Sequence, residues 1–186
     1  FSEMNGTDPL MNWLDLKNRK GYEVQLATRL MIWQSVGDSS RIGIKQYLQQ
    51  AYDNAGERDL EYVVILADAP EGQSQDGQVY VPTWWAPNPE APTEIKPGDN
   101  PYACVAGDDY LPDIFIGRVS GGSSTEISVY LAKVFRYETD PFISNPGWFQ
   151  KMICIAGNFS DTGGYPVTPV WNANWARAQM MQDGCI

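Results

Sequence analysis

The sequence predicts an α/β fold, in which helices cover a mainly parallel sheet. Two observations lead to this fold class. Short, continuous apolar runs such as Tyr62–Leu66 are typical of strands that helices cover on both faces. Longer segments with apolar residues at helical spacing alternate with these runs. This alternation favours a layered sheet with right-handed crossovers between parallel strands.

Helices are expected in four places. Residues 8–21 have an Asp-Pro start, an apolar face and a glycine stop, and residues 42–55 form a second amphipathic segment. The same spacing occurs in residues 125–138 and 171–181. The segment 29–36 is apolar and fits either a helix or a strand.

Strands are expected where apolar residues alternate with polar ones or form short continuous runs. Alternating apolar and polar residues predict a strand at 22–28, and a short strand is expected at 79–81. Continuous apolar runs predict buried strands at 114–116, which Gly117 should end, and at 152–156.

A long loop is expected at residues 73–100, which contain five prolines. Trp84 and Trp85 lie in this loop. If exposed, they would suit a sugar or a peptide partner. If packed, they would cover the core, and tryptophan is mostly buried on average. Both interpretations stay open.

The composition excludes several classes of function. A formal net charge of −10 leaves no basic patch to neutralise phosphates, so nucleic acid is not an expected partner. No apolar run approaches the ~20 residues of a membrane helix. The chain contains no histidine, so these residues cannot form a Ser-His or Cys-His pair by themselves.

The three cysteines do not indicate a metal site or a disulfide framework. Cys104, Cys154 and Cys185 lie far apart, and no CxxC pair is present. Cys104 and Cys154 have apolar neighbours and are expected to be small core residues. No glycine-rich dinucleotide fingerprint or phosphate-binding loop is present either, so a nucleotide cofactor is not supported.

An acidic turn within residues 107–118 leads directly into a predicted core strand. Asp109, Leu111 and Asp113 occupy alternate positions, so two carboxylates and a carbonyl could face one point, as a Ca²⁺ ion requires. The simpler interpretation is a solvated turn whose aspartates cap backbone amides. The spacing alone leaves both open.

Six strings of the sequence, taken in order, resemble one known family. They are residues 13–24, 44–52, 62–68, 99–102, 107–118 and 137–138, and residues 107–118 match best. The family is the gingipain-type cysteine peptidases, which are secreted bacterial endopeptidases with a caspase-like fold. The similarity spans nearly the whole chain, although alanine replaces a family glycine before Asp68.

The resemblance implies a caspase-like three-layer α/β/α sandwich that is truncated. Residues 1–150 would form the first α/β subdomain, and residues 151–186 the first strand and helix of the second. Residues 1–7 do not read as the apolar strand that the family has ahead of its first helix, so a polypeptide cut at both ends is expected. The family's catalytic histidine and cysteine lie further downstream, so Cys185 is not expected to be the nucleophile.

The resemblance also implies a structural calcium. Asp109 and Asp113 would give carboxylates, and Ala106 and Leu111 would give carbonyls. Trp171 stands where the family has a further histidine ligand, and tryptophan cannot bind the metal.

A substrate cleft would lie at the carboxyl ends of the strands. Its candidate residues are Asp68, Asp161, Trp84 and Trp85. Arginine specificity is not implied, because residues 168–169 are Thr-Pro where arginine-specific relatives have an aspartate.

The function that the resemblance implies is the non-catalytic portion of a secreted or cell-surface cysteine endopeptidase, inactive alone. Its partners would be the rest of its own catalytic domain and a protein or peptide substrate. The alternative is a non-catalytic surface module that binds glycan or peptide on the same scaffold.

Overall fold

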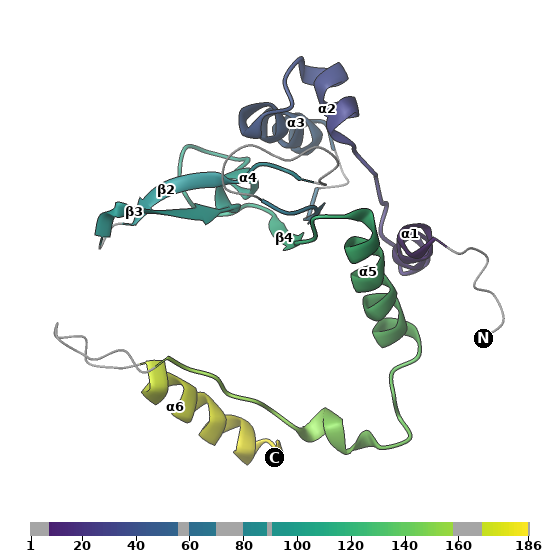
Figure 1. Cartoon of the computed structure of the whole chain (residues 1–186), viewed down its shortest axis with the longest axis vertical. Coiled ribbons are helices and arrows are strands. Elements are labelled where there is room, and N and C mark those ends of the chain that lie inside the picture. The colour runs from purple at the N-terminus through teal and green to yellow at the C-terminus, as the bar shows by residue number, and fades with distance from the viewer. Residues whose placement is uncertain (1–7, 56–59, 70–79, 89–90, 158–168, 186) are drawn as a thin grey trace. The chain divides into compact units, whose positions relative to one another are not determined.

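The computed structural model describes most of the chain, namely residues 8–55, 60–69, 80–88, 91–157 and 169–185. The chain forms two compact units, Phe1–Glu138 and Thr139–Ile186, and each is described by itself. Figure 1 follows the helices and strands along the chain.

The first two helices begin and end with clear capping residues. Helix α1, Pro9–Arg19, starts at Asp8, whose side chain accepts a hydrogen bond from the amide of Leu10 at 2.9 Å. This confirms the helix expected at 8–21. The ambiguous segment is also a helix, α2, Arg29–Val36, and Gly37 ends it in the left-handed conformation.

Two longer helices complete the helical layers of the first unit. Helix α3, Arg41–Asn54, and helix α5, Ser124–Thr139, agree with the expected segments. Ile127 and Leu131 form the buried face of α5. Tyr130, the residue before Leu131, is half exposed.

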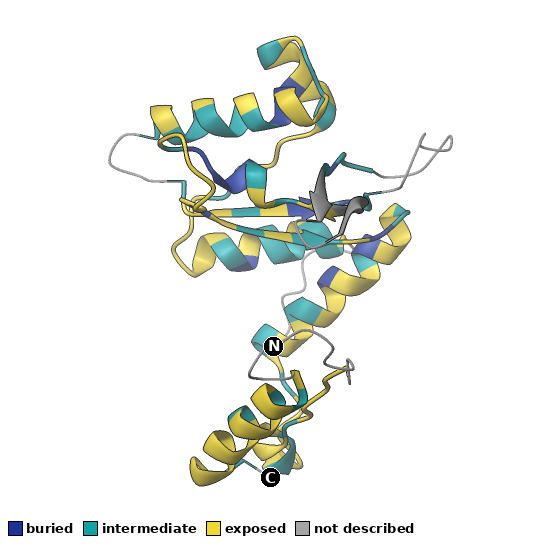
Figure 2. Ribbon diagram, turned by 90° about the vertical axis from the view of Figure 1, so that its left-hand side faces the viewer, coloured by how far each residue is buried: buried dark blue, intermediate teal, exposed yellow. Residues whose placement is uncertain are grey.

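The first unit contains one parallel pair of strands. Strand β1, Tyr62–Leu66, pairs with β4, Phe115–Val119, and Tyr62 lies opposite Phe115. Helices α2 and α3 lie on one side of this pair, and α1 and α5 lie on the other (Figures 1 and 2). Parallel strands between helical layers confirm the α/β fold class.

Three expectations for the strands are wrong. Gly117 does not end the last strand but lies inside β4. Residues 22–28 form no strand, because β1 pairs only with β4 among the described residues and this segment finds no ladder partner. Tyr62 and Val64 are 48% and 44% exposed, so helices cover only one face of β1 well.

The proline-rich stretch is not a structureless loop. Strands β2, Trp84–Asn88, and β3, Ala91–Gly98, pair antiparallel, with a register shift near Pro87. The short strand expected at 79–81 is represented by a single parallel bridge between Asp68 and Tyr80.

The core lies between β1 and the layer that contains α2, α3 and the short helix α4, Asn100–Ala103. It has two clusters of buried side chains, and Figure 2 colours the buried positions dark blue along the ribbon. The clusters are Ile32, Ile44, Ile65, Ala67 and Tyr102, and then Ala103, Val105 and Ile114.

The second unit contains a short 3₁₀ helix, Pro146–Gln150, and helix α6, Pro169–Gln182. Helix α6 confirms the last expected helix. The prediction of a buried strand at 152–156 is wrong. Ile153 and Ile155 are 85% and 89% exposed, since the described part of this unit contains no strand with which the run could pair.

Candidate functional site

A part-buried ion pair organises the carboxyl ends of β1 and β4. Arg118, in β4, donates from Nε to Oδ2 of Asp99 at 2.7 Å and from Nη2 to Oδ1 at 2.8 Å. Their side chains are 10% and 18% exposed. Burial alone would raise the pKa of Asp99, but hydrogen bonds from Arg118 and Thr83 outweigh it and hold that pKa below its usual value. Asp99 is therefore a fixed carboxylate.

The same guanidinium joins three backbone segments. Its Nη1 lies 3.2 Å from the carbonyl oxygens of Ala67 and Asp68 and 2.9 Å from that of Val81. These carbonyls belong to the end of β1 and to the segment that leads into β2. Arg118 and Asp99 thus form a clamp, the Arg118–Asp99 clamp, at the edge where parallel sheets bind ligands.

Two further side chains tie the segment before β2 to this clamp. The buried hydroxyl of Thr83 donates to Oδ1 of Asp99 at 2.8 Å. The hydroxyl of Tyr102 donates to the carbonyl of Pro82 at 2.6 Å, and burial raises the pKa of Tyr102. Tyr102 therefore stays protonated and holds this segment in place.

The sequence-predicted cleft residues lie around the clamp where they are described. Asp68 is half-buried, and its Oδ1 accepts a hydrogen bond from the amide of Ala69 at 2.8 Å. Trp84 packs edge-on against Tyr102, with ring centroids 6.1 Å apart. Trp85 is half-buried. Asp161 lies outside the described residues.

The acidic turn has the geometry of backbone capping. Oδ2 of Asp113 accepts from the amides of Val105 at 2.8 Å and Ala106 at 2.7 Å. Oδ1 of Asp109 accepts from the amide of Leu111 at 2.8 Å. Each carboxylate therefore uses one oxygen to hold the turn together.

The turn offers only part of a calcium site. Ca²⁺ takes about six to eight oxygen ligands. Asp109, Asp113 and the carbonyls of Ala106 and Leu111 would supply four, and the described residues hold no cluster of three or more His, Cys, Asp or Glu side chains that could bind a metal. A complete shell needs oxygens from water or from another segment.

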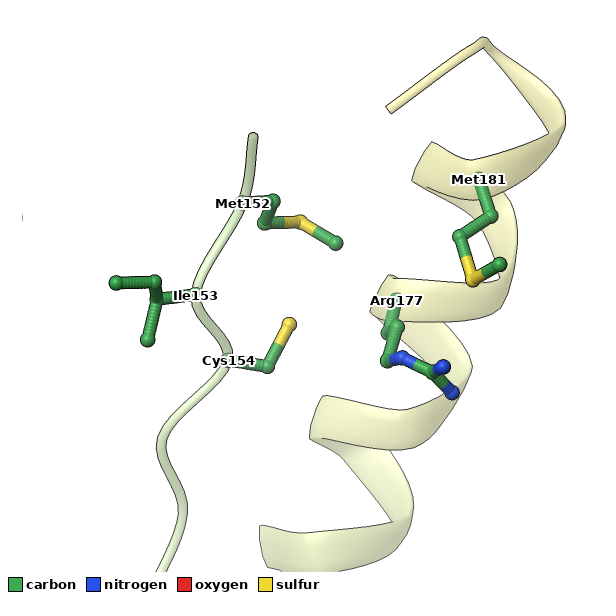
Figure 3. A pocket seen from close by; sticks show the side chains of 5 residues that line it. All are labelled: Met152, Ile153, Cys154, Arg177 and Met181. Carbon is green, nitrogen blue, oxygen red and sulfur yellow. The ribbon is translucent and has the colours of Figure 1, made fainter. Parts of the chain in front are cut away.

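The described cysteines differ in their surroundings. Cys104 is buried, as expected, but Cys154 is exposed, so the prediction that it is a core residue is wrong. The side chain of Cys154 points toward α6, where Arg177 and Met181 line the other side of a pocket of about 360 Å³ (Figure 3). No histidine exists in the sequence to activate any of these thiols.

Sequence reasoning missed the Arg118–Asp99 clamp. One signal was present: Arg118 follows an apolar run inside a core strand, and a charged side chain at such a position needs a partner. The sequence does not say which of the chain's 23 acidic residues that partner is.

The sequence profile of peptidase family C25 matches residues 3–183. The chain belongs to this family. Gingipain R2 of Porphyromonas gingivalis is 24% identical over 150 residues, which cover 79% of this chain and 17% of that protein. A gingipain R1 of the same organism is also 24% identical over 150 residues, with 79% and 13% covered. The chain thus spans less than a fifth of the length of these relatives and forms a gingipain-like peptidase region.

Solved structures agree with this family assignment at the level of the fold. The complex of P. gingivalis RgpB pro- and mature domains matches with a TM-score of 0.66 at 20% identity. The Arg-specific cysteine proteinase gingipain R (RGPB) matches with a TM-score of 0.64 at 22% identity. Both matches cover 94% of this chain and 36% of the solved chain.

Proposed function

We propose that the chain is the non-catalytic portion of a gingipain-like cysteine endopeptidase, whose catalytic histidine and cysteine lie outside these 186 residues. One observation carries the proposal: the family profile matches residues 3–183, yet the sequence contains no histidine. A thiol needs a neighbouring base to become an effective nucleophile, and histidine is that base in this type of enzyme. The chain alone is therefore inactive.

The role left for this portion is to support one wall of the substrate cleft. The Arg118–Asp99 clamp fixes the end of β1 and the segment before β2, and it thereby positions Asp68, Trp84 and Trp85. Asp161 lies outside the described residues and stays a cleft candidate on the sequence alone. Residues 1–150 would be the first subdomain and 151–186 the beginning of the second.

A cleavage assay tests the proposal. The 186-residue chain and a longer polypeptide that continues through the downstream histidine and cysteine are each incubated with peptide substrates. We expect cleavage only by the longer polypeptide, and loss of cleavage when its downstream cysteine is replaced by alanine. Equal cleavage by parent and Cys→Ala variant would refute the mechanism.

A glycan- or peptide-binding module is the second candidate. Its support is weaker, because Trp84 is already engaged by Tyr102 and by the guanidinium of Arg41, 5.3 Å from its ring. The two candidates predict different sequences beyond Ile186 in the parent polypeptide. A continuation without a Gly-His-Gly turn and a later cysteine would favour the binding module.

We propose a structural role for calcium at the acidic turn, with Asp109 and Asp113 as carboxylate ligands. The support is the pair of carboxylates on one short turn, each with one oxygen that accepts no hydrogen bond among the described residues. Calorimetric titration with Ca²⁺ tests this role, with Asp109→Asn as the variant. We expect heat and a raised melting temperature for the parent and a reduced response for the variant. No heat and an unchanged melting temperature would reject the site.

The proposed partners derive from the proposed enzyme. They are the rest of the catalytic domain and a protein or peptide substrate, and we place the parent enzyme outside the cell or on its surface. Among the described helices, none combines the length and the apolar character needed to cross a bilayer.

A further inference from the structure

Two arginines stand at the start of neighbouring helices, next to the carboxyl end of β1. Arg29 is the first residue of α2, and Arg41 is the first residue of α3. Nη2 of Arg29 lies 3.3 Å from the carbonyl oxygen of Ser39, only two residues before Arg41. Two positive charges therefore gather at one place in a chain whose net charge is −10.

Aromatic rings hold both guanidinium groups in place. That of Arg29 lies 4.5 Å from the ring centroid of Tyr80, and that of Arg41 lies 5.3 Å from the ring centroid of Trp84. Both distances are within the range of cation–π attraction. Tyr80 and Trp84 are four residues apart in one segment, and the stretch of chain that carries the two rings is called the platform below.

The platform itself is fixed. Tyr80 bridges to Asp68 at the end of β1, and Trp84 packs on the buried ring of Tyr102. The Arg118–Asp99 clamp holds the backbone between the two rings through the carbonyl of Val81. A ligand that reaches this platform therefore meets preorganised cations, which lowers the entropic cost of binding.

Neither guanidinium has an acidic partner among the described residues. Every ion pair of the described residues uses another cation, namely Lys17, Arg19, Lys20 or Arg118. Nε of Arg29 is also shielded from water and has no hydrogen-bond partner in the described structure. A buried donor left unpaired is unfavourable, so this side chain has unused capacity for hydrogen bonds.

The Arg29 end of the platform is accessible. Arg29 and Tyr80 line an open cavity of about 2090 Å³ that also runs beside β1, and Arg41 is exposed. Guanidinium groups form paired hydrogen bonds with carboxylates, and the adjacent rings suit an apolar stem.

We propose that Arg29 and Arg41, on the platform of Tyr80 and Trp84, bind the carboxylate side chains of an acidic peptide segment. The choice of a peptide rests on the proposed endopeptidase function. The site lies at the sheet edge assigned to the cleft wall, where it would hold an acidic segment of the substrate.

Titration of the 186-residue chain with a glutamate-rich hexapeptide tests this site, with amide chemical shifts as the readout. The matched ligand is the same peptide with glutamine at each glutamate. Arg29→Gln and Arg41→Gln should each weaken binding at least about tenfold, the loss expected for a charge-assisted hydrogen bond. Lys45→Gln removes a charge from α3 but leaves both arginines and both rings intact, and it should bind like the parent.

Arg41→Lys is the control for loss of folding, because it keeps the positive charge on an exposed side chain. It should bind the peptide more weakly than the parent but more tightly than Arg41→Gln. Equal affinity for the glutamine peptide, or parent-like binding by both glutamine variants, would overturn the site. The site would also be overturned if inorganic phosphate bound to it and the acidic peptide did not. If the longer polypeptide cleaves peptides while this chain binds no acidic peptide, the site fails and the proposed function stands.

Discussion

Arg118 joins several segments of the first unit through one side chain. Its guanidinium makes five hydrogen bonds, two to the carboxylate of Asp99 and three to carbonyls at the ends of neighbouring segments. These partners offset the loss of water around a part-buried charge. The stability of this edge of the sheet therefore depends on a single side chain.

Arg118→Met should destabilise the chain by about 2 kcal/mol, because it leaves the part-buried carboxylate of Asp99 without its cation. Urea unfolding measures the change as a lower midpoint at unchanged slope. Arg19→Met, which breaks an exposed pair with Asp15, is the control and should cost less than about 1 kcal/mol. Similar costs for both variants would contradict the account of the clamp.

The lowered pKa of Asp99 predicts a pH dependence with a definite sign. A carboxylate whose pKa is lower in the folded state stabilises the fold above its unfolded pKa of about 3.9, and this contribution is lost as pH falls through the folded value. The stability difference between the parent and Asp99→Asn should be constant from pH 7 to about 5 and should shrink below about 4. Urea unfolding at several pH values measures it. A difference that stays constant down to pH 3 would argue against a stabilised carboxylate.

Single residues were partly predictable from the sequence. Asp8 was expected as a cap, and the aspartates of the acidic turn were expected to cap amides in one of two interpretations; the structure contains these contacts. Their partners lie within eight residues along the chain, so local rules apply. Arg118 and Asp99 are 19 residues apart, and nothing local selects that pairing.

At the level of elements, capping and helical spacing located the helices, whereas the strands were harder. A helix makes its backbone hydrogen bonds within itself, but a strand needs a neighbouring strand for them. The sequence does not say whether that neighbour is present. This is why residues 22–28 and 152–156 form no strand in the described structure. The β2–β3 hairpin was missed because its prolines argue against a strand.

Helix α5 allows a direct test of which face is buried. Leu131 is 1% exposed and Val129 is 51% exposed. Leu131→Ala should cost about 2–4 kcal/mol through lost burial and a cavity. Val129→Ala should change stability by less than about 0.5 kcal/mol. Thermal and urea unfolding compare the two, and equal effects would mean that this face of the helix is assigned wrongly.

At the level of the whole molecule, the sequence established the fold class and the family more securely than it established a site. Ordered strings spread over the chain identify a family even when each string alone is weak, and the absence of histidine restricts the chemistry of the entire chain. The sites depend on contacts between distant segments, which one sequence does not specify.

The central proposal is that the nucleophile of the parent endopeptidase lies outside these 186 residues. The most direct measurement is to treat the longer polypeptide with a peptide chloromethyl ketone and to locate the alkylated residue by mass spectrometry. The account predicts a single modified cysteine beyond Ile186. Modification of Cys104, Cys154 or Cys185, with loss of activity, would contradict it.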